Sequence, residues 1–226
     1  MRLTIGLINE SKKNPPYDHN YLLASAFLSV LREHDSGLST ILHDMKSTSP
    51  YVLSEIFPRR DWDWTGYFCV GSSNSKLIKL ISEALVPQTK IRVSDVEYSV
   101  SDIKVEPTPT DLPSPLELRT LSPVLVRESN NHSRCAIPTD ACYLETLNRL
   151  LKSKIDGYVG KSHSCSVLRV IPDCVRKRHI SNGIVLATKG TYFVEGSSDA
   201  ISFLLDHGMG SNTSMGFGFV VPSGRW

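Results

Sequence analysis

The strongest chemical signal in the chain is a glycine-rich segment near its C-terminus. It pairs Gly208 with Gly210 and Gly216 with Gly218 around a short polar stretch. Glycine at such positions indicates left-handed backbone, or backbone that another molecule approaches closely. Hydroxyl, amide and backbone N–H groups between the pairs could bind phosphate oxygens. The candidate contact residues are Gly208, Gly210, Ser211, Asn212, Thr213, Ser214, Gly216 and Gly218.

The order of elements around this segment argues against a nucleotide site. An apolar stripe predicts a helix before the glycines, capped by Ser197 or Ser198, and a strand at 218–221 after them. P-loop and Rossmann loops run instead from a strand into a helix N-terminus, whose dipole favours phosphate. We therefore exclude an ATP or NAD site. A purely structural alternative remains, because Gly208 suits a helix end and the second glycine pair suits a bulged strand.

A basic run in the second half is another candidate surface for phosphates. Arg176, Lys177 and Arg178 follow a strand-like stretch that carries Arg169. Such a run is usually a solvated loop, but a hairpin could also present it to a phosphate backbone. The aromatic pair Trp62 and Trp64 suits either base stacking or packing beside a loop.

The cysteines and histidines match no regular metal site. The chain has five cysteines, an odd number, and no pair is spaced C-x-x-C. His132 with Cys135, and His163 with Cys165, fit no common zinc spacing. We therefore expect no metal, no cofactor and no disulfide scaffold, and a reducing, cytoplasmic location.

The composition is that of an ordinary globular protein. The 226 residues allow one large domain or two smaller ones, with 40% hydrophobic and 21% charged residues. No apolar run reaches the ~18 residues of a membrane helix, and the N-terminus does not read as a signal peptide. The net charge of +2 is uneven: residues 1–114 hold 12 basic and 14 acidic residues, and residues 115–226 hold 13 and 9.

Hydrophobic periodicity predicts the same succession of elements in each half of the chain. In the first half, helices begin after Asp18 and Asn74, a helical turn covers 38–44, and strands lie at 2–8, 52–57, 66–70, 90–93 and 103–105. In the second half, helices begin after Thr139 or Asp140 and after Ser197 or Ser198, and strands lie at 116–126, 167–171, 184–187 (continued by 191–194) and 218–221.

The two halves read as a duplicated unit joined by a proline-rich connector. Residues 106–115 hold four prolines, which favour a linker over a central strand. The helix starts Asp18 and Asn74 are 56 residues apart, and Asp140 and Ser198 are 58 apart. The pattern predicts an α+β fold of tandem ferredoxin-like, RRM-like (βαββαβ) domains over residues 1–112 and 116–226.

At the glycine-rich segment the chain resembles the RAMP superfamily. Within it, the chain resembles the CRISPR-associated endoribonucleases that cut precursor CRISPR RNA within its repeats. Leu42-His43-Asp44 matches that family's Leu-His-acidic motif, and residues 16–23 and 121–124 resemble its first helix entry and its second-domain strand. The resemblance therefore spans the whole chain.

The resemblance implies a reaction that needs no metal. A ribose 2′-hydroxyl attacks the adjacent phosphate and leaves a 2′,3′-cyclic phosphate and a 5′-hydroxyl. It implies His43 as the proton-transfer group, since histidine titrates near neutral pH, and Lys46 is our candidate for the cation that holds the developing charge. The implied partner is CRISPR repeat RNA or its crRNA product. Effector-complex proteins and a homodimer are left open as partners, and no membrane is expected.

The sequence departs from the family pattern at two helper positions. Some members carry a tyrosine and a lysine where this chain has Leu28 and Ser49. Tyr17, Tyr21 and His19 remain candidates to assist His43. The departure also keeps open a RAMP subunit that binds crRNA without cutting it, and a ferredoxin-like scaffold with no RNA role.

Overall fold

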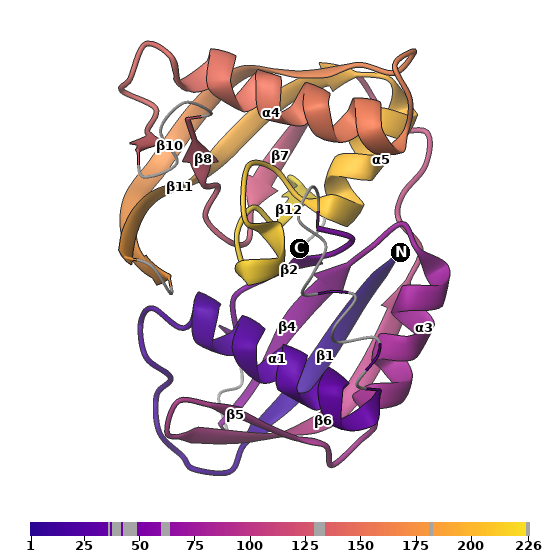
Figure 1. The fold of residues 1–226 in the computed structure, drawn as a ribbon, viewed down its shortest axis with the longest axis vertical. Helices are drawn as coiled ribbons and strands as arrows, with labels where there is room; N and C mark the ends of the chain where they lie inside the picture. The colour runs from indigo at the N-terminus through magenta and orange to yellow at the C-terminus, as the bar shows by residue number, and fades with distance from the viewer. Residues whose placement is uncertain are drawn as a thin grey trace.

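The computed structural model describes residues 1–35, 37, 42, 49–59, 64–128, 134–180 and 183–224. Two sheets, each covered on one face by two helices, lie one above the other, with the N-terminal half at the bottom of Figure 1. The predicted helical turn at 38–44 lies outside the described residues apart from Leu42.

The N-terminal sheet has the strand order β2-β4-β1-β6-β5, with β3 also paired to β4, and its pairs are antiparallel. Helices α1 and α3 bury their apolar stripes on it, among them Leu23, Phe27 and Ile81. The elements are β1 (Arg2–Asn9), α1 (Asn20–His34), β2 (Val52–Leu53), β3 (Phe57–Pro58), β4 (Thr65–Gly71), α3 (Ser75–Ala84), β5 (Lys90–Val93) and β6 (Val96–Glu106).

The C-terminal sheet has the order β10-β11-β7-β12, again antiparallel, beside a small β8–β9 ladder. Helices α4 and α5 cover its core, which includes Leu147, Tyr192 and Leu204. The elements are β7 (Leu116–Thr120), β8 (Val126–Arg127), β9 (Cys135–Ala136), α4 (Tyr143–Tyr158), β10 (Cys165–Ile180), β11 (Gly183–Gly196), α5 (Ser198–His207), the 3₁₀ turn η1 (Thr213–Met215) and β12 (Val220–Pro222).

Apart from short additional strands, both halves follow the βαββαβ order. The first strand of each half is central: β1 lies between β4 and β6, and β7 lies between β11 and β12. The predicted fold class, α+β with tandem ferredoxin-like halves, is confirmed. Each half has its own hydrophobic core. The division into domains at residues 1–112 and 116–226 stays a prediction.

Two of the four predicted helix caps are confirmed. The Asn74 side chain accepts a hydrogen bond from the Leu77 amide at 3.1 Å, and Ser197 accepts one from Ala200. The other two are wrong, because long-range or turn contacts hold those carboxylates. Asp18 faces His179, and Asp140 accepts from the Ile137 amide before α4 begins three residues later.

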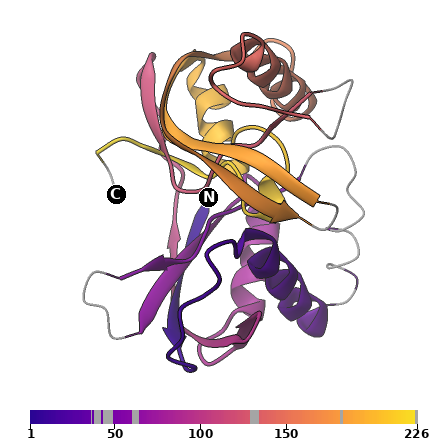
Figure 2. The same ribbon diagram turned by 90° about the vertical axis from the view of Figure 1, so that its left-hand side faces the viewer.

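The strands of the second half also differ from the prediction. The strand expected at 116–126 ends at Thr120, because the ladder becomes irregular there: the next two backbone amides, of Leu121 and Ser122, both donate to the Phe219 carbonyl. The expected strands at 167–171 and 184–194 extend into a long hairpin of β10 and β11, in which Arg176 and Lys177 pair with Ala187 and Leu186. The basic run therefore lies within a strand. Figures 1 and 2 show the hairpin tip beside the start of α1.

The two halves meet where α5 ends. The guanidinium of Arg2, at the start of β1, is buried and donates to the carbonyls of Leu205 and Val220, both at 2.6 Å. The amino group of Met1 pairs with Asp206 at 2.9 Å. The Leu205 carbonyl lies in the last turn of α5, where backbone acceptors lack partners within the helix, and the Val220 carbonyl belongs to β12.

His207 is a neutral histidine at this junction. Its Nε2 accepts from the Ser73 backbone amide and lies 2.7 Å from the Ser73 hydroxyl, while Nδ1 faces the Ser49 carbonyl at 3.4 Å. Burial lowers the pKa of His207 from 6.5 to about 4. Within this shift, Lys154 and the N-terminal amino group also lower the pKa, and the hydrogen bond with the Ser49 carbonyl raises it.

We predict an acid-sensitive junction. The unfolded chain takes up a proton on this histidine below pH 6.5, while the folded chain resists it down to about pH 4. As the pH is lowered through this window, the free energy of unfolding should therefore decrease, by up to about 3 kcal/mol from this group. Urea denaturation at pH 7 and pH 4.5 should show a smaller loss for His207→Gln than for the wild type. Exposed His34→Gln is the control; an equal loss in all three proteins would contradict the prediction.

Candidate functional site

The two predicted catalytic residues, His43 and Lys46, lie outside the described residues. Ser49, three residues after Lys46, lies within the described part of the chain, and hydrogen bonds fix its position. Its hydroxyl donates to the Tyr51 carbonyl at 2.7 Å, and its own carbonyl faces His207. The chain after the Leu42-His43-Asp44 motif therefore lies beside the end of α5, where the glycine-rich segment begins.

His19, one of the candidate helpers, has a structural role. It is buried, its Nδ1 donates to the Pro16 carbonyl at 2.9 Å, and its Nε2 accepts from the Ile56 amide at 3.0 Å. Burial lowers the pKa of this imidazole. Both ring nitrogens are occupied, so His19 joins residues 16–19 to residues 55–56 and is poorly placed to exchange a proton.

The four glycines of the C-terminal segment are all in the left-handed region, with φ between 70° and 83°. A methyl group on Gly218 would collide with the Met209 carbonyl, and one on Gly210 would collide with that of Leu125. Added Cβ atoms on Gly208 and Gly216 would lie 2.7 Å from Val52 and 3.1 Å from Asn20. Packing against the chain itself therefore accounts for glycine at each place.

The polar residues between the glycine pairs differ in exposure. Thr213 and the four glycines are buried, whereas Ser211, Asn212 and Ser214 are partly exposed. The Asn20 side chain donates to the Gly216 carbonyl and so ties the segment to α1. Of the polar side chains between the glycine pairs, a ligand can therefore reach those three, and the predicted phosphate contacts stay a prediction.

Arg178 corrects the prediction for the basic run. It is only 1% exposed, and its Nη2 donates to Glu55 at 2.8 Å. Lys189 contacts the other oxygen of the same carboxylate, and Asp18 lies 3.7 Å from Arg178 Nε. The expectation that Arg178 faces a phosphate backbone is wrong, because this side chain anchors the hairpin to the N-terminal half.

The Glu55 carboxylate stays ionised in this cluster. Burial by itself would raise its pKa, but Lys189 and Arg178 together lower the pKa below its ordinary value. A buried carboxylate between two cations is stable only while all three remain, since removing one partner leaves an unpaired buried charge.

The neighbouring side chains of the hairpin remain accessible. Lys177 is exposed and Arg176 is partly exposed. The ring of Tyr17, 68% exposed, lies over the guanidinium groups of Arg176 and Arg178 at 5.3 and 4.8 Å. An exposed aromatic ring beside accessible cations is the arrangement with which proteins bind single-stranded nucleic acids.

The described residues hold no group of three or more histidine, cysteine, aspartate or glutamate side chains placed to bind a metal ion. All five cysteines are free thiols. Within the part of the chain that the structure describes, no helix is both long and apolar enough to cross a bilayer.

The packing of the glycine segment predicts a large difference between two glycine-to-alanine substitutions. Gly218→Ala should lower the free energy of unfolding by about 3 kcal/mol or more, because it adds strain at positive φ and a backbone clash. Gly157→Ala, in α4, meets no atom within 4 Å and should stabilise by up to about 1 kcal/mol. Urea denaturation checks both; equal stability of the two variants would contradict this packing account.

Comparisons with known proteins agree with this architecture. Residues 106–222, more than half of the chain, match the family described as CRISPR associated protein Cas6, C-terminal. The chain is 26% identical to CRISPR-associated endoribonuclease Cas6 1 of Methanocaldococcus jannaschii, over 98% of this chain and 92% of that protein. It is 22% identical to the putative CRISPR-associated endoribonuclease-like protein Cas6nc of Pyrococcus horikoshii, over 97% and 98%.

Among solved structures, one titled CRISPR associated protein Cas6 superposes with a TM-score of 0.81 at 25% identity, over 98% of both chains. The family match covers the glycine-rich segment and the β10–β11 hairpin, and the structural likeness extends through the N-terminal half. The chain therefore belongs to the Cas6 family of CRISPR-associated proteins.

Proposed function

We propose that the protein is an endoribonuclease that cleaves precursor CRISPR RNA within its repeats to give mature crRNA. The observation that carries this proposal is the similarity, over nearly the whole of both chains, to a relative named a CRISPR-associated endoribonuclease. The Leu42-His43-Asp44 motif supports it, because it supplies a histidine where the resemblance expects the catalytic one.

The proposed reaction is an attack by a ribose 2′-hydroxyl on the adjacent phosphate. His43 moves the proton of the 2′-hydroxyl, and Lys46 stabilises the negative charge that develops on the phosphorane. The bond to the 5′ oxygen of the next nucleotide breaks, leaving a 2′,3′-cyclic phosphate and a 5′-hydroxyl. The attacking group belongs to the RNA, so this mechanism requires no metal-bound water.

RNA binding is proposed for the hairpin surface made by Tyr17, Arg176 and Lys177. Arg178 lies beneath it and holds it in place through Glu55. Ser211, Asn212 and Ser214 are proposed as further contacts, reached from the exposed side of the glycine-rich segment.

The catalytic proposal predicts that His43→Ala slows single-turnover cleavage of repeat RNA by about 10²–10⁴-fold, the usual contribution of one proton-transfer group. Its affinity for RNA should stay near the wild-type value. His34→Ala, at the exposed end of α1, is the matched control and should cut normally. Normal cleavage by His43→Ala would exclude this residue.

The binding proposal predicts a change in salt dependence. Arg176→Ala combined with Lys177→Ala should reduce the slope of log affinity against log salt by about 1.5, from two lost phosphate contacts. Lys76→Ala with Lys79→Ala, exposed on α3, is the control pair. Titrations at several salt concentrations measure both slopes, and an unchanged slope in the hairpin variant would exclude this surface.

A second function, binding crRNA without cutting it, is favoured by Leu28 and Ser49 at the two helper positions. The Ser49 hydroxyl is engaged with the Tyr51 carbonyl and carries no charge. Incubation of labelled repeat RNA with the protein in EDTA separates the two functions. A discrete cut supports the nuclease, and tight binding with intact RNA supports the binding subunit.

A further inference from the structure

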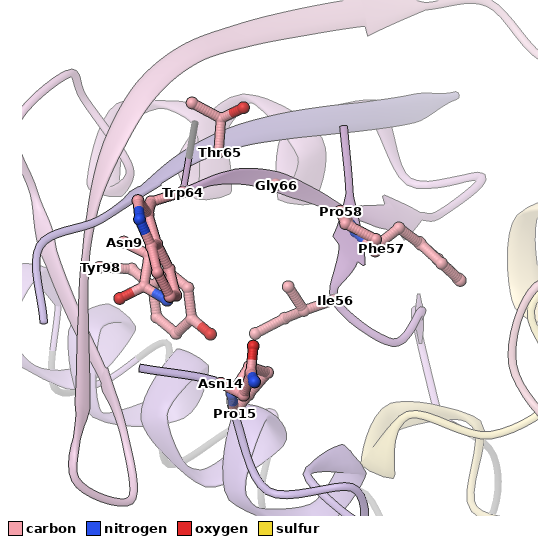
Figure 3. A pocket seen from close by; sticks show the side chains of 10 residues that line it. All are labelled: Asn9, Asn14, Pro15, Ile56, Phe57, Pro58, Trp64, Thr65, Gly66 and Tyr98. Carbon is pink, nitrogen blue, oxygen red and sulfur yellow. The ribbon is translucent and has the colours of Figure 1, made fainter. Parts of the chain in front are cut away.

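A small pocket lies on the N-terminal half between the chain that follows β1 and strands β3 and β4. Its empty space is about 350 Å³, a figure that includes the open solvent at its mouth. Figure 3 shows Trp64, Tyr98 and Asn9 together at one edge, with Ile56, Asn14 and Pro15 across from them.

Two buried polar atoms at this pocket have unused hydrogen-bonding capacity. The Tyr98 hydroxyl has no partner among the described residues, although Tyr98 is only 3% exposed. The Oδ1 atom of Asn9 is also buried and has no partner among these residues, while Nδ2 of the same side chain donates to the Lys13 carbonyl at 2.6 Å. Buried polar groups in native proteins are nearly always satisfied, so these two atoms are available to a bound ligand or to water.

The chemistry of the lining selects the kind of ligand. The lining residues carry no formal charge, which disfavours a phosphate. Trp64 offers a flat aromatic surface, and its backbone carbonyl accepts a hydrogen bond from the Asn9 backbone N–H at 2.7 Å. Asn9 Oδ1 accepts only, so the ligand must present an N–H or O–H group to it. A planar heterocycle with N–H donors and oxygen or nitrogen acceptors fits these requirements.

The pocket adjoins the proposed RNA-binding surface. Pro15 is two residues before Tyr17, and Ile56 directly follows Glu55, which pairs with Arg178. His19 holds these two segments together through the Ile56 amide. Lys189 Nζ, the second cation on Glu55, lies 5.8 Å from the Phe57 ring centre at the pocket edge. A strand bound along Tyr17 can therefore reach the pocket with a neighbouring nucleotide.

We propose that this pocket takes one unstacked nucleobase of the bound RNA, which stacks on Trp64 and bonds to Tyr98 and Asn9. The proposal rests on the proposed function, because it needs the chain to bind RNA. Single-stranded RNA is commonly read in this way, by aromatic stacking combined with hydrogen bonds to base edges.

The test combines a protein variant with an RNA variant. A labelled RNA carrying one CRISPR repeat of the source organism is made as a series, each with one nucleotide replaced by an abasic one. Fluorescence anisotropy gives the affinity of each RNA for the wild type, Trp64→Ala and Tyr98→Phe. We expect one abasic position to weaken wild-type binding about tenfold, as the loss of a stacked base does. At that position neither variant should lose more, since the base they contact is already absent.

Tyr98→Phe separates recognition from folding. Its hydroxyl has no partner to lose, so the melting temperature should stay the same or rise while binding of intact RNA weakens severalfold. Tyr158→Phe, on α4 of the other half, is the control and should bind intact RNA as the wild type does.

The pocket would be overturned if the protein substitution and the abasic nucleotide weakened binding additively at every position, or if Tyr98→Phe bound RNA with wild-type affinity. In either case, cleavage of intact RNA by the wild type would still support the proposed function. If the wild type binds no repeat RNA at all, the proposed function fails, and the base pocket fails with it.

Discussion

The arrangement of the molecule depends on one buried guanidinium. Arg178 leaves water almost completely, and two of its nitrogens have no hydrogen-bond partner among the described residues. Such a charge is tolerable only beside a fixed carboxylate, so Glu55 and Asp18 of the N-terminal half must stay where they are. The β10–β11 hairpin is thereby held over α1. Tyr17, Arg176 and Lys177 owe their common surface to this contact.

The same logic operates at the other junction, where α5 ends. Arg2 caps carbonyls of the C-terminal half, and the glycine segment folds closely enough to meet Val52 and Asn20. The Ser49 carbonyl, at the far side of the proposed catalytic segment, faces His207 here. The proposed chemistry and the proposed RNA binding therefore both depend on contacts between the two halves.

The sequence predicted the fold because local signals decide it. Apolar stripes set the helices, and Asn74 and Ser197 cap as short-range chemistry requires. It failed for Asp18 and Arg178 because their partners lie far along the chain: Arg178 and Glu55 are 123 residues apart. A run of three basic residues looks uniformly solvated, and only the folded hairpin distinguishes Arg178 from its neighbours. His43 was proposed from the family resemblance, since a lone histidine beside an aspartate has no pattern of its own. The pocket was not predicted, although Trp64 was noted, because its lining comes from separated segments.

In the proposed reaction the RNA's own 2′-hydroxyl is the nucleophile, and His43 moves its proton. The most direct measurement uses a repeat RNA with a single 2′-deoxy nucleotide on the 5′ side of the cut, incubated with the protein in EDTA beside the all-ribose RNA. We expect the all-ribose RNA to be cleaved to a 2′,3′-cyclic phosphate, identified by mass, and the substituted RNA to remain uncut at the 2′-deoxy position. Cleavage of the 2′-deoxy RNA at the same bond would contradict it.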